Sequence, residues 1–169
     1  IIRLIRNAGG NALSRDKQGN TPFSIVLGKD ESIIKEILGD NYTITDSDGN
    51  TPVHIAVKAK ASASLIQKLI DDGYPVDTRN ADGYTALNYA IEMNDLRSSL
   101  VLLENGANPF QMIDKKGKNG ISIALENGNG NMISNIVKYA GKMTDVQGNT
   151  ILHYAAKTSS AEMVKKLIS

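Results

Sequence analysis

Two histidines are the side chains of this 169-residue chain best suited to acid–base chemistry or metal binding. His54 and His153 are its only histidines, and an imidazole can ligate a metal or exchange a proton near neutral pH. Each follows a threonine by three residues, in the segments TPVH and TILH. They are therefore either metal or acid–base groups, or structural parts of a recurring segment.

A glycine-rich stretch and two pairs of acidic residues offer further chemistry. Gly128-Asn129-Gly130 precedes a helical pattern, but no strand precedes it and no Lys-Ser or Lys-Thr follows, so an inter-helix turn fits better than a phosphate loop. Asp71-Asp72 and the pair Asp46 and Asp48 suggest calcium, yet Gly49 follows Asp48 at once and the distal Glu of an EF-hand is absent. Asp46 instead fits a turn in which its side chain bonds its own backbone.

Catalytic signatures are missing from the chain. The serines form no G-x-S-x-G elbow, and neither H-E-x-x-H nor a Walker loop occurs. Without cysteine there is no disulfide, no Cys-based zinc site and no thiol nucleophile. We expect no catalytic residue, no cofactor and no metal, and hence no enzyme.

Composition limits the partners. Apolar residues make up 41% and charged residues 22%, as in soluble folded proteins. A net charge of +1 argues against nucleic acid as a partner, and no apolar run approaches the ~18 residues of a membrane span, so no membrane insertion is expected. The lack of cysteine favours an intracellular protein but does not exclude a secreted or exported one.

An internal repeat decides the architecture. Five segments share one template: DKQGNTPFSIV, DSDGNTPVHIA, NADGYTALNYA, DKKGKNGISIA and DVQGNTILHYA, starting at Asp16, Asp46, Asn80, Asp114 and Asp145. Their glycines are spaced by 30, 34, 34 and 31 residues, which is too long for heptads and too short for independent domains. Such a period is typical of stacked repeats.

Each copy has a local physical explanation. Glycine permits a tight turn at the tip of a hairpin, the residue two positions later can cap a helix through its side-chain oxygen, and a proline next suits the first helical position. The predicted structural positions are Gly19, Thr21, Pro22, Gly49, Thr51, Pro52, His54, Gly83, Thr85, Gly117, Asn119, Gly148, Thr150 and His153.

Two helices follow each hairpin. The first is expected to run about nine residues and to end near Asp30, Lys60, Asn94, Gly128 or Ser159. The second carries an apolar stripe, as in the sets Ile33, Ile34, Ile37, Leu38; Leu65, Ile66, Leu69, Ile70; and Met132, Ile133, Ile136, Val137. Left-handed helix ends are predicted at Gly39, Gly73, Gly106 and Gly141.

No single hairpin with two short helices can hide its apolar face, so the copies must stack. The predicted fold class is an all-α repeat solenoid of β-hairpins and antiparallel helix pairs, in one domain over 1–169. Its expected units are the end of a preceding repeat at 1–13, repeats at 14–43, 44–77, 78–111 and 112–142, and a truncated repeat at 143–169. Because both ends of the chain fall inside helical patterns, we expect the array to continue beyond one or both.

The template resembles the ankyrin repeat, whose pattern D-x-x-G-x-T-P-L-H-x-A is nearly intact in DSDGNTPVHIA, and SLVLLENGANP from Ser99 is similar to the family's second-helix ending. The resemblance covers the whole chain and implies that each histidine ring bonds a neighbouring hairpin and links repeats. The sequence departs from the pattern at Asn119-Gly120, which replaces Thr-Pro, and at Ser98 and Ser99, which stand where an apolar pair is usual.

The family resemblance also implies a function. Ankyrin proteins usually bind protein partners through a concave face of hairpin tips and first helices, so we expect a non-catalytic, monomeric scaffold for another protein. The alternative is a regulatory or targeting arm of a larger protein. On that face Tyr84 and Met93 offer an anchor, and a lysine cluster could attract an acidic segment. The candidate partner-binding residues are Tyr84, Met93, Lys115, Lys116, Lys118, Asp48 and Asp82.

Overall fold

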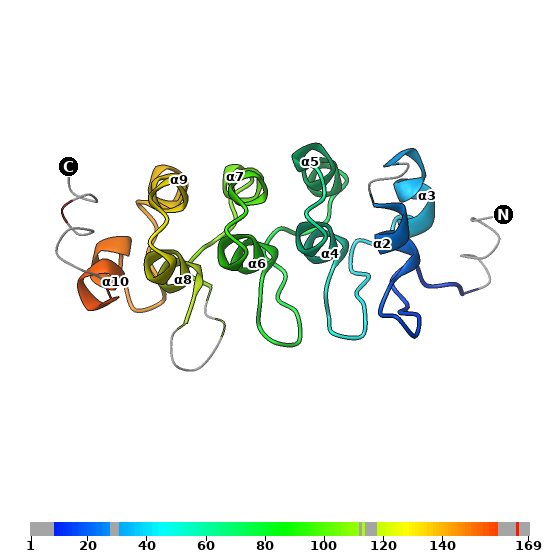
Figure 1. Cartoon of the computed structure of the whole chain (residues 1–169), viewed down its shortest axis with the longest axis horizontal. Coiled ribbons are helices and arrows are strands. Elements are labelled where there is room, and N and C mark those ends of the chain that lie inside the picture. The colour runs from blue at the N-terminus through cyan, green and yellow to red at the C-terminus, as the bar shows by residue number, and fades with distance from the viewer. Residues whose placement is uncertain (1–8, 28–30, 112, 114–117, 159–164, 166–169) are drawn as a thin grey trace.

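The computed structural model describes residues 9–27, 31–111, 113, 118–158 and 165, and over these ranges short helices form a pair of rows that run side by side along the molecule (Figure 1). The first row contains α2 (Pro22–Val26), α4 (Pro52–Lys58), α6 (Ala86–Glu92), α8 (Gly120–Asn127) and α10 (Ile151–Thr158). The second contains the 3-10 helix η1 (Glu31–Ile33) with α3 (Ile34–Leu38), α5 (Ala63–Asp71), α7 (Leu96–Glu104) and α9 (Gly130–Ala140). The predicted repeat solenoid is confirmed.

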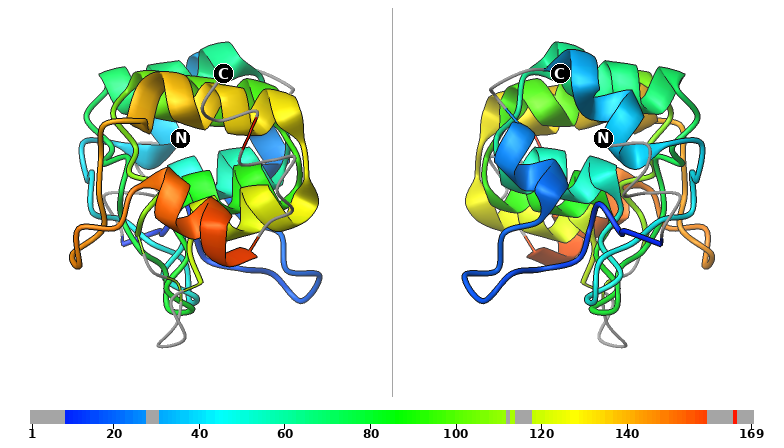
Figure 2. Two further views of the ribbon diagram at one scale, coloured as in Figure 1. Left: turned by 90° about the vertical axis from the view of Figure 1, so that its left-hand side faces the viewer. Right: turned by 90° about the vertical axis from the view of Figure 1, so that its right-hand side faces the viewer.

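The first, second, third and fifth units each start with a hairpin turn that is closed by backbone hydrogen bonds around its glycine. In the second unit Asp46 N donates to Asn50 O at 3.0 Å and Gly49 N to Asp46 O at 3.0 Å. The glycines of the first, second, third and fifth turns, Gly19, Gly49, Gly83 and Gly148, have φ between 78° and 83°, a range that residues with a Cβ rarely adopt. End-on, the hairpins before α4 and α6 project from one side of the helix rows, whereas those before α2 and α10 splay to either side (Figure 2).

The predicted helix starts are confirmed in all five units, and the predicted side-chain cap is seen in four of them. Side-chain oxygens of Thr21, Thr51, Thr85 and Asn119 accept the backbone N–H three residues on, at the N-termini of α2, α4, α6 and α8. Pro22 and Pro52 occupy the first helical position. In the fifth unit α10 begins at Ile151, and Thr150 Oγ1 lies 2.9 Å from the His153 ring, as Thr51 Oγ1 lies 2.8 Å from that of His54.

The first helices are slightly shorter than the nine residues predicted. Helices α4 and α6 have seven residues each and α8 has eight, because the chain turns away through left-handed backbone at Lys60, Asn94 and Gly128. These are the ends that the sequence indicates. Helix α2 ends earlier, at Val26, and the expected ends at Asp30 and Ser159 lie outside the described residues.

Two predictions for the second helices are wrong. The sequence pattern places Val137 in the buried stripe of α9, but this residue is 37% exposed, because the buried face of the helix continues through Ala140 instead. Gly141 is predicted to be left-handed, yet its φ is −61°. Its lack of a side chain allows close approach to the Val137 carbonyl, which a Cβ would meet. Gly39, Gly73 and Gly106 do have the predicted positive φ.

The core lies between units as well as within them. All six residues from Pro52 to Val57 of α4 are buried, and α4 contacts α2 and α6 in its own row and α5 behind. Ser98 and Ser99, at the expected apolar positions of α7, are also fully buried. Their hydroxyls donate to Asp95 Oδ2 at 2.6 Å and to the Leu96 carbonyl at 3.0 Å, so the polar pair is satisfied.

Gly120 has a packing role that the sequence did not reveal. A Cβ at this buried position would lie 2.9 Å from Ile91 Cδ1 and 3.0 Å from the Pro109 carbonyl oxygen, so only glycine lets α8 start this close to α6 and to the preceding loop. Gly130, at the start of α9, has open space around it. None of the helices in the described ranges is long and apolar enough to cross a membrane.

Substituting these two glycines should have opposite effects. Alanine in an unobstructed helix is better than glycine by ~1 kcal/mol, so Gly130→Ala should raise the free energy of unfolding by about 0.5–1 kcal/mol. Gly120→Ala should lower it by about 1–3 kcal/mol, because the added methyl overpacks the interface. Denaturant unfolding of both variants measures the difference. Equal effects would show that the contact around Gly120 is not tight.

Candidate functional site

The hairpins are held by side chains that bond their own backbone. Asp46 is 7% exposed, and its Oδ1 accepts the N–H groups of Asp48 at 3.0 Å and Asn50 at 2.8 Å. The predicted turn at Asp46 is confirmed. Burial alone would raise the pKa of Asp46, but bonds from Asn50, Arg15 and the Asp48 N–H outweigh it and lower the pKa below its usual value. Asp46 is therefore a fixed negative charge at the base of the hairpin.

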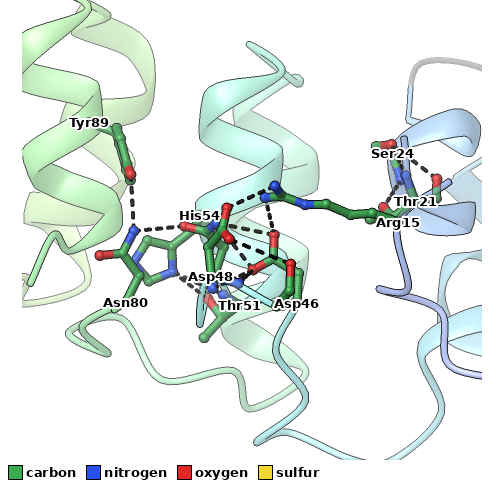
Figure 3. A network of polar contacts seen from close by, with 11 residues as sticks. Arg15, Thr21, Ser24, Asp46, Asp48, Thr51, His54, Asn80 and Tyr89 are labelled. Carbon is green, nitrogen blue, oxygen red and sulfur yellow. Dashed lines mark hydrogen bonds and ion pairs between the residues drawn. The ribbon is translucent and has the colours of Figure 1, made fainter. Parts of the chain in front are cut away.

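Contacts between neighbouring hairpins set the spacing of their tips (Figure 3). Arg15 reaches from the first unit to the second, with its guanidinium 2.6 Å from Asp46 Oδ2 and 2.8 Å from Asp48 Oδ2. Between the second and third units, Asn80 Nδ2 donates to Asn50 Oδ1 at 2.9 Å and Ala81 N donates to the Asp48 carbonyl at 2.8 Å. Three successive hairpins are thus tied together.

His54 adds a link beneath the tips. The Thr51 N–H donates to its Nδ1 at 3.2 Å, so the proton of the neutral ring is on Nε2, which donates to the Tyr84 carbonyl of the next hairpin at 3.0 Å. The structural interpretation is confirmed for His54. Among the described residues no three His, Cys, Asp or Glu side chains gather in a group that could hold a metal.

Other units lack this histidine link. Asn88 takes the equivalent place in the third unit and accepts the Thr85 N–H at 2.8 Å, but its Nδ2 has no hydrogen-bond partner there. His153 of the fifth unit keeps the bond to Thr150 and is exposed. The interface between the second and third units is therefore the one described interface that a histidine bridges.

An aromatic cluster lies on the hairpin and first-helix surface of the third unit. The ring of Tyr84 packs against Tyr89 of α6, with centroids 4.8 Å apart, and its hydroxyl donates to Glu92 Oε1 at 3.4 Å. Lys58 Nζ of the neighbouring α4 lies 4.7 Å from the centroid of Tyr89. Tyr84 is half-buried, because its ring lies against Tyr89 of α6. The two packed rings therefore form an ordered aromatic surface, with the polar side chains of Glu92 and Lys58 at its edges.

The remaining candidate residues differ in their surroundings. Asp82 is exposed, whereas Met93 is half-buried directly after α6 and Asp48 is engaged by Arg15. Lys118 is half-buried, and its carbonyl accepts the Ile113 N–H at 2.7 Å. Lys115, Lys116 and Gly117 lie outside the described residues. That these side chains contact a partner remains a prediction.

Sequence reasoning missed Tyr89 and Arg15. Tyr89 occupies a template position that is isoleucine in three other copies, so the pattern alone indicates a core residue. Arg15 directly precedes a repeat segment, and its partners lie about thirty residues away. One feature of the sequence could have pointed to Arg15. An arginine recurs at the same position, one residue before the repeat segment, as Arg79 in the third copy.

Comparisons with known proteins agree with the repeat. A family model described as ankyrin repeats in three copies matches residues 23–113 and 100–169. Human Rabankyrin-5 is 24% identical over 169 residues, which cover 95% of this chain but 14% of that protein; the mouse protein is 26% identical, also over 14% of its length. The mouse B-cell lymphoma 3 protein homolog is 28% identical over 73% of this chain and 29% of its own length.

A solved structure is similar in fold. The crystal structure of the ankyrin repeat domain of Bcl-3 superposes with a TM-score of 0.73 at 20% identity, covering 98% of this chain and 75% of that chain. At this identity the likeness concerns the fold alone. The architecture of hairpins and paired helices is therefore shared with a solved ankyrin repeat domain.

Burial of His54 should make stability depend on pH. Burial lowers the pKa of its ring, so the unfolded chain binds the proton more readily as the pH falls through about 6.5. The contribution of the neutral His54 ring to the free energy of unfolding is therefore complete above pH 6.5 and is lost as the pH falls below it. The wild type should therefore lose more free energy of unfolding between about pH 7.5 and pH 5.5 than His54→Asn, which copies the residue at Asn88. Denaturant titrations at both pH values measure this, and identical losses would contradict it.

Proposed function

The chain belongs to the ankyrin-repeat family, and from that premise we propose that it is a non-catalytic scaffold that binds another protein through its hairpin tips and first helices. Ankyrin repeats are generally protein–protein interaction modules. The observation that carries the proposal is the Tyr84–Tyr89 cluster, which is pre-packed on this surface. Family membership supports binding of another protein as the general function, and the cluster supports the choice of this surface for it.

The cluster has the properties of a binding anchor. Tyrosine is enriched among the residues that dominate binding energy, since it buries a large area while its hydroxyl keeps a polar contact. The contacts of Tyr84 with Tyr89 and Glu92 hold the ring in place before a partner arrives. Little conformational entropy is then lost on binding, which increases the net affinity.

Charge is expected to help select the partner. Lys115, Lys116 and Lys118 are clustered in the fourth hairpin sequence, next to the unit that carries Tyr84. A local positive patch in a chain with net charge +1 speeds association with an acidic segment and depends on salt. The proposed partner therefore combines an apolar or aromatic contact for Tyr84 with an acidic stretch near the fourth hairpin.

A regulatory or targeting arm is the second candidate. The chain spans 14% of the length of the Rabankyrin-5 proteins, so relatives of this kind carry such a segment alongside much other sequence. The arm would use the same surface to bring an attached activity to a partner. The two candidates differ in what the binding event controls, and substitutions on the surface affect both.

Tyr84→Ala should weaken partner binding about 10- to 100-fold while the helical spectrum is retained. The partner is first identified by photo-cross-linking in extracts of the source cells, from a probe at Ser47 on a hairpin, with a probe at Ser134 on α9 as the control. Affinity is then measured by calorimetry with the purified partner. The matched control is Tyr42→Ala, because Tyr42 is a partly exposed tyrosine that packs on Tyr74 at 5.3 Å, away from the hairpin tips.

Two results would contradict the proposed face. If Tyr84→Ala and Tyr42→Ala lost equal binding affinity, the loss would come from lower stability of the fold and not from a missing contact with the partner. The assignment would also be wrong if binding survived both Tyr84→Ala and the change of Lys115, Lys116 and Lys118 to Glu. Weaker binding of the lysine variant, with a reduced dependence on salt, is the expected outcome.

A further inference from the structure

A buried tyrosine hydroxyl lies where the second helices of the first two units meet. Tyr74, in the loop after α5, is 3% exposed, and its hydroxyl has no hydrogen-bond partner in the part of the chain that the structure describes. The amide nitrogens of Asn88 and Asn119 share this condition, but the oxygens of those side chains are bonded. Because an unmet hydroxyl is costly to bury, Tyr74 is the side chain most in need of a partner from outside the chain.

The hydroxyl belongs to this chain and not to the repeat pattern. Directly after a glycine with positive φ, the Tyr74 N–H donates to the Leu69 carbonyl at 3.1 Å. In the third unit the Ala107 N–H makes the same bond, to the Leu102 carbonyl at 3.0 Å, after another such glycine. The two residues therefore stand at the same place in their units, and Tyr74 brings a ring and a hydroxyl where the third unit has one methyl group.

Tyr74 lines a small pocket between the first and second units. Ile34, Leu38 and Gly39, in α3 and at its end, form one side of it. Tyr42, which is 36% exposed, forms another, with its ring edge-on to that of Tyr74 and the centroids 5.3 Å apart. The pocket has a volume of about 10 Å³, close to the least that holds one water molecule. It therefore admits one small polar group beside apolar walls.

The charges around the pocket favour a neutral partner. Burial is the main cause that raises the pKa of the Tyr74 hydroxyl to about 12, so the group stays protonated and donates. The carboxylates of Asp72 and Asp40 contribute to the same rise, and they disfavour an anionic acceptor for the same reason. A cation cannot accept the hydroxyl proton, and Lys35, which also lines the pocket, repels it. A neutral oxygen meets these requirements.

We propose that this pocket is a binding site for one neutral hydroxyl group, supplied by water or by a small alcohol. The bound oxygen accepts the Tyr74 O–H, and in an alcohol the carbon atoms face Ile34 and Leu38. The pocket lies between α3 and the loop after α5, in the second helix row, whereas the Tyr84–Tyr89 cluster lies on the first row and its hairpin (Figure 1). The site is therefore separate from the surface proposed for the protein partner.

Titration of the full chain with ethanol tests the proposal, because ethanol joins one hydroxyl to a short apolar body. Chemical shifts of the Gly39 and Tyr74 amides are followed by NMR, and we expect them to saturate in the wild type. Tyr74→Phe keeps the ring and removes the donor, so it should weaken ethanol binding by about tenfold or more. The matched control is Tyr139→Phe, which removes a hydroxyl that already donates to Glu104 Oε1 at 2.7 Å and should change nothing at the pocket.

The two sources of the hydroxyl give different results. If water is the source, ethanol causes no saturable shift, and cross-relaxation from a long-lived water to the Gly39 amide appears in the wild type and is lost in Tyr74→Phe. If an alcohol is the source, the saturable shift appears and depends on Tyr74. Absence of both signals in the wild type overturns the proposal, as does an ethanol response or a water signal that Tyr74→Phe leaves unchanged.

Discussion

Burial of each inner first helix, α4, α6 and α8, between its two neighbours is the constraint on which the rest of the structure depends. In α4, apolar and polar residues from Pro52 to Val57 are all buried, and α6 and α8 bury most of their residues in the same way. A helix of seven or eight residues is too short to be stable in water by itself, so it forms only when units stack. Stacking then fixes where each hairpin leaves the helix row.

Polar contacts convert this stack into a surface of defined shape. The links from Arg15 to Asp46, from Asn80 to Asn50 and from His54 to the Tyr84 carbonyl join consecutive hairpins through side chains that are themselves held by local turns. Because each link joins one repeat to the next, the distance between neighbouring hairpin tips is set by the stacking of the repeats and not by the loops alone. The Tyr84–Tyr89 pair owes its position to this framework.

Features of local origin could be predicted from the sequence, and features that depend on neighbouring units could not. The turns at Gly19, Gly49, Gly83 and Gly148 and the caps at Thr51 and Thr85 follow from backbone geometry within a few residues, so their prediction was correct. The predicted burial of Val137 was wrong, because the sequence does not show how far the neighbouring helices extend over α9. The contact of Gly120 with Ile91 spans two units and leaves no trace in a single sequence.

Hydrogen exchange of the inner helices after damage to α6 tests the stacking constraint most directly. Leu87 is fully buried in α6, and Leu87→Ala should lower the free energy of unfolding by about 2–5 kcal/mol. If no unit is stable alone, amide exchange should speed up by similar factors in α4, α6 and α8. Acceleration confined to α6, with α4 and α8 unchanged, would show that the units fold independently and would contradict the account.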